Sequence, residues 1–173
     1  MRLPPLAGKP IEIRFLADPR AHRGRLHPSG DRGVEVHAGT FLRKRLIVLD
    51  LALKQQPGEL TRIFVHELFH FVWLRLGNTR RRSFEDLLAG EVRHGVSGDL
   101  GWSAESRKFA LRNGDLRRRT RRWREYACES FCDTAAWLYS GVARHDEFTL
   151  SRTARQARRA WFEHAGLGKG ISV

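Results

Sequence analysis

The stretch IFVHELFHFVWL, residues 63–74, decides the fold because it places three polar side chains inside a continuous apolar run. Residues four apart lie on the same face of a helix, so His66 and His70 present two imidazoles in one direction, with Glu67 beside them. This is the HExxH motif, in which two neutral imidazoles bind zinc (Zn²⁺) and the glutamate takes a proton from a water molecule that the metal activates. The stretch therefore predicts a helix with a zinc site, with His66 and His70 as ligands and Glu67 as the catalytic base.

The predicted helix has clear ends. Pro57 with the two residues after it is typical of a helix start, and Gly77 is typical of a helix end. Because the residues around the motif are almost all apolar, we expect this helix to be central and nearly buried. The alternative without metal is a pair of core histidines with Glu67 as their counter-ion. An unpaired buried carboxylate is costly, and this cost favours the metal site.

Length and composition favour a single domain. We expect one domain over residues 1–173, with a sheet-rich part at 1–56, a helical part at 57–165 and a flexible tail at 166–173. Neither a membrane-spanning apolar run nor the apolar segment of a signal peptide is visible, so we expect a cytoplasmic protein without membrane contact. The two cysteines, Cys128 and Cys132, are four apart in a helical pattern. This spacing suits reduced thiols packed against neighbours, and a metal role is the alternative.

The segments around the motif predict an α+β fold. Residues 11–16 and 34–41 alternate apolar and polar side chains, and residues 45–50 form an apolar run, so all three are expected to be strands. Residues 20–32 are expected to be a loop with solvated histidines. We predict a small, twisted, mostly antiparallel sheet packed on the HExxH helix, followed by a helical C-terminal half. The further helices are expected at 83–90, at 103–112, at 116–139 and from Thr149 or Ser151 to before Gly166, with a glycine-rich loop at 91–102 that borders the site.

The charge of the chain is strongly positive, with a formal net charge of +13. Arginines cluster at 80–82, 117–124 and 152–159. Such a field attracts polyanions, so an acidic protein substrate or non-specific contact with nucleic acid fits the composition. No recognised nucleic-acid module accompanies the charge, and the alternative is a set of solvated helix faces.

A catalytic zinc site needs a third protein ligand. Trp73 and Leu76 occupy the places where the extended form of the motif has its glycine and third histidine, so the ligand lies farther along the chain. The best candidates are Glu129 and Asp133, which are one turn apart on an otherwise largely apolar helix and have no basic residue four positions later. An acidic strip paired with arginine-rich neighbours is the alternative.

The combination of HExxH at 66–70 with Glu129 and Asp133 resembles the gluzincin metallopeptidases, the thermolysin-like clan, and among them the minimal single-domain type. The resemblance implies a zincin-like fold with Glu129 as the third zinc ligand. It implies that Asp133 accepts a hydrogen bond from the far ring nitrogen of His66 and so orients the ring. It also implies that a peptide substrate lies antiparallel to an edge strand, and residues 34–41 are in the right place for that strand.

The residue that supports the oxyanion in larger gluzincins cannot be aligned. Tyr126, which lies nearly one turn before Glu129, and His94, in the glycine-rich loop, are the two candidates. Each has a simpler interpretation, as a core tyrosine and a loop histidine.

Three functions are therefore expected in order. The first is a zinc metallopeptidase that hydrolyses a peptide or protein substrate with metal-activated water. The second is a SprT-like, DNA-associated protease, in which a later histidine, here His94, would be the third ligand. The third is a non-catalytic, zinc-stabilised domain for nucleic-acid binding or protein interaction.

Overall fold

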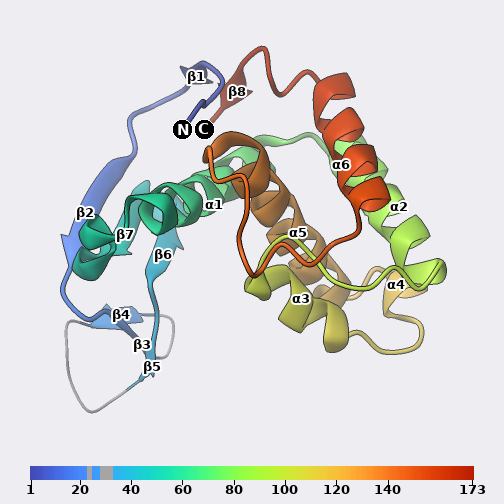
Figure 1. The fold of residues 1–173 in the computed structure, drawn as a ribbon, viewed down its shortest axis with the longest axis horizontal. Helices are drawn as coiled ribbons and strands as arrows, with labels where there is room; N and C mark the ends of the chain where they lie inside the picture. Colours follow the sequence, from blue (N-terminus) through green and yellow to red (C-terminus); the bar gives the residue numbers. More distant parts are fainter. Residues whose placement is uncertain (23–24, 28–32) are drawn as a thin grey trace.

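The computed structural model describes residues 1–173 except 23–24 and 28–32. The fold is α+β, as predicted, with small sheets and six α-helices among the described residues. In Figure 1 most strands lie to one side of the long helix α1 (Pro57–Arg75), and most of the other helices lie to the other side. None of the helices in the described part combines the length and the apolar character that crossing a bilayer requires.

The sheet that packs against α1 has the strand order β2 (Glu12–Leu16), β7 (Leu46–Asp50), β6 (Ala38–Phe41). The pairing of β6 with β7 is antiparallel, but β2 pairs with β7 in parallel, so this sheet is mixed and the prediction of a mostly antiparallel sheet is wrong for it. The apolar strand β7 takes the centre because its residues are buried throughout, as expected of an interior strand. Strand β6 is left at an edge.

A second sheet occupies part of the predicted loop. It has the order β4 (Arg25–His27), β3 (Arg20–His22), β5 (Val34–Glu35) and is antiparallel. The predicted strand 34–41 is therefore divided between β5 and β6. The division falls at Val36 and His37, where the Val36 amide donates to the carbonyl of Pro19 and the His37 carbonyl accepts from Asp50. The other predicted loop residues, 23–24 and 28–32, lie outside the described part of the chain.

Helix α1 confirms the predicted central helix. A short 3-10 turn, η2 (Leu51–Gln55), leads into it, and Pro57 stands at its first position as the sequence predicts. Its apolar face, which includes Val65, Phe69 and Val72, is almost completely buried against α5 (Arg121–Tyr139) and the sheet. This packing holds α1 and α5 face to face, and the site described below lies between them.

The remaining helices differ from the predictions at their ends. Helix α2 begins before Ser83, whose hydroxyl accepts a hydrogen bond from Trp161, and it continues three residues past Gly90. The predicted helix 116–139 is interrupted at Arg119, which has a left-handed φ of 46°. Ser151 caps the last helix by accepting from the Ala154 amide, as one of the two predicted alternatives has it. The bounds of these helices are α2 (Asn78–Arg93), α3 (Trp102–Phe109), α4 (Asp115–Arg118) and α6 (Arg152–His164).

The segment predicted as a flexible tail is part of the folded core. Strand β8 (Ile171–Ser172) pairs in parallel with β1 (Leu6–Ala7), so the first and last strands lie side by side in Figure 1. Ile171 and Val173 are 3% and 5% exposed and belong to the main hydrophobic cluster. The prediction was wrong because the partner of this strand lies at the opposite end of the sequence.

A buried ion network joins α6 to α2 and to the loop before α3. Arg158 is fully buried, and its guanidinium lies 2.7 Å from Oε2 of Glu91 and 2.6 Å from Oδ1 of Asp99. The side chain of Tyr126 donates to the other oxygen of Asp99 at 3.2 Å. One arginine of the basic clusters therefore pairs with carboxylates inside the protein and does not face solvent.

Candidate metal centre

The two histidines of the HExxH motif lie side by side on α1. Their ring centroids are 5.0 Å apart, with the ring planes 78° from each other. One ligand atom from each of His66, Glu67 and His70 lies within 4.8 Å of the others. The four-residue spacing on a regular helix thus brings three possible metal ligands together, as the motif predicts.

Helix α5 places two carboxylates around His66. Nδ1 of His66 donates to Oδ1 of Asp133 at 2.6 Å, and Nε2 of the same ring is 3.2 Å from Oε2 of Glu129. Two donors that share a tetrahedral zinc ion at about 2.0–2.1 Å lie roughly 3.3–3.4 Å apart. The spacing of His66 and Glu129 therefore fits two ligands of one ion, while Asp133 occupies the position that orients the ring.

The Asp133 carboxylate is itself fixed by the start of helix α3. Its Oδ2 accepts a hydrogen bond from the amide of Ala104 at 3.0 Å and so caps a helix whose own N-cap residue, Gly101, has no side chain. A β-carbon at Gly101 would lie 2.3 Å from the carboxyl carbon of Asp133. The predicted cap, Ser103, does not perform this role. Sequence analysis missed Gly101 because its partner belongs to a different helix.

Replacing Gly101 by alanine is expected to displace the Asp133 carboxylate and weaken zinc binding. Loss of a group that orients a ligand typically lowers metal affinity about tenfold to a hundredfold. Competition between the protein and a chelator of known affinity measures the change. Gly90→Ala is the matched control, because that position in α2 has no atom within 4 Å of the added β-carbon. Equal zinc affinity in the two variants would show that Asp133 tolerates the displacement.

Glu67 is held by the edge strand of the sheet. The Thr40 hydroxyl of β6 is 2.6 Å from Oε2 of Glu67 and 3.0 Å from the Glu67 backbone carbonyl. Because a hydroxyl has one hydrogen, it donates to one of these oxygens at a time. The contact fixes the side chain that the motif predicts as the base. Thr40 lies in a predicted strand, but no sequence pattern relates it to a helix residue 27 positions later.

A cavity of about 420 Å³ opens above these groups. His66, Glu67 and Asp133 lie along it, and Ala38 of β6 forms part of its wall. The indole of Trp102, 69% exposed, lines the cavity from the start of α3. The predicted base and one predicted zinc ligand are therefore accessible from a hollow large enough for part of a peptide.

One wall of the cavity is an ion pair network that sequence analysis missed. Arg62 lies one turn before His66 on α1 and is 9% exposed. Its guanidinium contacts Glu59 at 2.8 Å and Glu147 at 3.1 Å, and His145 contacts Glu59 at 2.7 Å. Burial alone would lower the pKa of Arg62, but these carboxylates raise it above its ordinary value. The network attaches the loop that contains Glu147 to α1.

The charges around His66 shift its titration strongly. Burial would lower the pKa of His66, but Asp133 and Glu129 outweigh burial and raise it well above 6.5. Burial would raise the pKa of Glu129, but the hydrogen bond from His66 and the charges of His70 and Arg107 lower it to about 2. In the metal-free protein His66 is therefore an imidazolium ion between two carboxylates, and zinc binding requires that it lose the proton on Nε2.

The stability of the metal-free protein should consequently depend on pH through this pair. A raised histidine pKa contributes stability that is fully present below 6.5 and is lost as pH rises through the folded value. The lowered pKa of Glu129 contributes stability above 4.5 that is lost as pH falls towards about 2. Urea unfolding with chelator present, for the wild type and His66→Gln, measures the difference. We expect that difference to shrink as pH rises above 6.5, and a constant difference would contradict the assignment.

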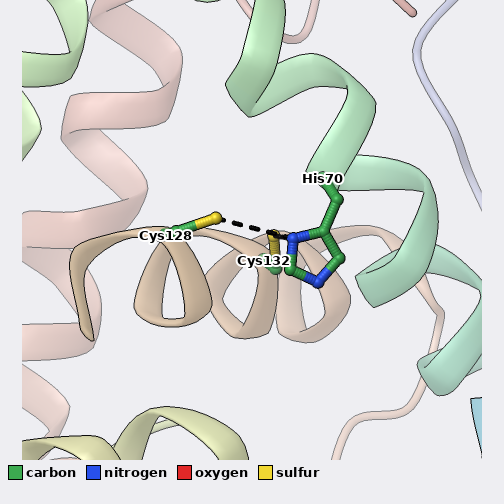
Figure 2. A group of neighbouring side chains, drawn as sticks. All are labelled: His70, Cys128 and Cys132. Atoms are coloured by element: carbon green, nitrogen blue, oxygen red, sulfur yellow. Dashed lines mark hydrogen bonds between the residues drawn. The ribbon is translucent and has the colours of Figure 1, made fainter. Parts of the chain in front are cut away.

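The other ring, His70, faces sulfur. Its Nδ1 is 3.5 Å from the Sγ atoms of both Cys128 and Cys132, which lie on neighbouring turns of α5 (Figure 2). The hydrogen bond from Cys132, helped by His70, lowers the pKa of Cys128 to about 6, although burial opposes this shift. Burial raises the pKa of Cys132 well above its ordinary value. Both cysteines are reduced, as predicted.

The two residues predicted as oxyanion helpers do not reach the cavity. Tyr126 is fully buried and donates to Asp99, as described above. His94 is exposed at the end of α2, where its Nδ1 donates to the carbonyl of Gly90 at 2.7 Å. Neither side chain lines the cavity. Both predictions are therefore corrected: Tyr126 is a core residue, and His94 is a helix-end residue.

Comparisons with protein-family models, curated protein sequences and solved structures find no match for the chain. Arguments about function consequently depend on the residues of the site and on their contacts. The central contacts are those of His66 with Asp133 and Glu129.

Proposed function

We propose that the protein is a zinc-dependent metallopeptidase of the gluzincin type with a zincin-like domain. Zinc would be held by His66, His70 and Glu129, with Asp133 orienting the first histidine. The main support is that one helix, α5, supplies a carboxylate to each nitrogen of His66, at 2.6 and 3.2 Å. An ion pair alone would account for His66. It would not account for Glu67 and His70 lying within 4.8 Å of the same ring beside an open cavity.

The residues around the site support a hydrolytic role. Zinc, when bound, would polarise a peptide carbonyl group and make a water molecule more acidic. Glu67 lies beside the ligands, and the Thr40 hydroxyl orients its carboxylate. In the proposed reaction Glu67 accepts the proton of the attacking water and later transfers it to the leaving amine. Thr40 acts as a positioning residue, because its contact is with Glu67.

The edge strand suggests how a substrate would bind. In the sheet order β2-β7-β6, strand β6 has a described partner on one side only. An extended peptide adds readily to such an edge through main-chain hydrogen bonds. A peptide placed beside β6 would run past Ala38 and over Glu67, with Trp102 available to contact its side chains across the cavity. The proposed substrate is therefore a peptide or an unfolded protein segment in extended form.

Metal analysis of single variants tests the proposal. We expect His66→Ala, His70→Ala and Glu129→Ala each to lose stoichiometric zinc after dialysis, while His94→Ala keeps it. His164→Ala, at an exposed position in the last turn of α6, controls for the loss of any histidine. Full zinc content in Glu129→Ala together with loss in His94→Ala would overturn the gluzincin assignment in favour of the SprT-like alternative.

The geometry gives the SprT-like alternative less support. That function requires His94 to join the other two histidines at the metal. His94 instead contacts Gly90 at the exposed end of its own helix. The third alternative, a non-catalytic zinc-stabilised domain, predicts the same metal content and differs only in activity, which the Discussion addresses.

A further inference from the structure

Three donor atoms meet on the side of His70 that faces α5. They are Nδ1 of His70 and the Sγ atoms of Cys128 and Cys132, and each lies within 4.8 Å of the others. Figure 2 shows the imidazole projecting from α1 towards the two sulfurs, which α5 presents from consecutive turns. Cys132 is fully buried and Cys128 is partly accessible, so an ion could enter from the side of Cys128.

The distances match those of a tetrahedral metal site. Zinc binds thiolate sulfur at about 2.3 Å and imidazole nitrogen at about 2.0–2.1 Å, which separates the two donors by roughly 3.5–3.6 Å. Both observed separations from Nδ1 to sulfur are 3.5 Å. Hydrogen bonding explains this symmetry less well, because Nδ1 has either one hydrogen or one lone pair and serves one sulfur at a time. A metal ion uses all three donors at once.

We propose that His70, Cys128 and Cys132 form a second metal site, which binds a thiophilic ion of the Zn²⁺, Cd²⁺ or Cu⁺ class. Two thiolates and one imidazole are soft ligands that select such ions over Mg²⁺ or Ca²⁺. The inference goes beyond the proposed function and does not depend on it, because the site uses neither Glu67 nor Glu129. It assigns the metal role that the spacing of the two cysteines leaves open.

The second site would regulate the first through the shared ring. A neutral imidazole has one lone pair, so His70 can bind a metal through Nδ1 or through Nε2 but not through both. An ion at the cysteines would therefore remove His70 from the HExxH site. We expect Cd²⁺ bound at the cysteines to weaken zinc binding by His66 and Glu129.

The test uses the full chain, reduced and stripped of metal, titrated with Co²⁺ and separately with Cd²⁺. The measured signal is the ultraviolet charge-transfer absorption that appears when a thiolate binds either ion. We expect this band in the wild type and in Glu129→Ala, and its loss in the double variant Cys128→Ser/Cys132→Ser. Circular dichroism checks that each variant is folded. Should Cys132→Ser at the buried position not fold, Cys128→Ser alone is expected to lose most of the band.

Two results would overturn the proposal. One is the absence of a thiolate band in the wild type although both thiols are shown to be reduced. The other is a His70→Ala variant that keeps the band with unchanged Cd²⁺ affinity, which would remove the histidine from the site. Failure of the proposed peptidase function gives a different pattern, since the band in Glu129→Ala and Glu67→Gln then persists while hydrolysis is absent in every form.

Discussion

Glu67→Gln is expected to reduce peptide hydrolysis about a hundredfold to ten-thousandfold, the usual contribution of a positioned general base. The glutamine oxygen can still accept the Thr40 hydrogen bond that holds Glu67, so the side chain should stay in place. The zinc ligands are unchanged, so zinc content should equal that of the wild type. Cleavage of a mixed peptide library by the zinc-loaded proteins, followed by mass spectrometry, measures the effect.

The control for this variant is Glu163→Gln, which makes the same chemical change at an exposed position on α6. It should cleave the library as fast as the wild type. A peptide that Glu67→Gln and the wild type cleave at equal rates would remove Glu67 from the mechanism. Zinc binding without any hydrolysis by the wild type, across peptides and unfolded proteins, would favour the non-catalytic zinc-stabilised domain.

Arg158→Met is expected to destabilise the fold by about 3–5 kcal/mol, the usual cost of removing one partner from a buried ion pair. The guanidinium contacts both Glu91 and Asp99, at 2.7 and 2.6 Å, and all three side chains are buried. Methionine fills much of the volume but leaves two carboxylates without a counter-charge. Urea denaturation of the metal-free proteins at neutral pH measures the difference.

The matched control is Arg152→Met, an exposed position on the same helix, where the change should stay within about 0.5 kcal/mol. Adding Glu91→Gln and Asp99→Asn to Arg158→Met should recover part of the lost stability, because the unpaired charges are then removed. A loss below about 1 kcal/mol in the single variant would mean that water or a rearranged side chain satisfies the carboxylates.

The parts of the fold that were predicted correctly are those determined by local sequence. The spacing of apolar residues around His66 fixes α1, and the apolar run before it fixes β7 as an interior strand. The segments predicted wrongly depend on distant partners. Ile171 is buried because it pairs with Leu6, and Arg20–His22 is a strand because Val34–Glu35 lies beside it. Neither pairing leaves a local pattern in the sequence.

The candidate site shows the same division. The proximity of His66 and His70 follows from their spacing on one helix, and the resemblance to gluzincins suggested that Glu129 and Asp133 would lie near them. Contacts between separate elements, such as that of Thr40 with Glu67, were not predicted. Tyr126 and His94 were misassigned because hydrogen-bond partners that the sequence does not reveal hold them elsewhere.

The pairing of β1 with β8 affects how the chain folds during synthesis. Leu6 leaves the ribosome early, but its partner Ile171 is translated only after every helix has been made. Strand β8 also contacts α1, so the apolar surface that it covers on α1 stays open until then. Contacts between residues so far apart in sequence form slowly and leave intermediates prone to aggregation. The last strand therefore completes the core after translation of the helices, and a nascent chain that lacks it depends on chaperones for protection.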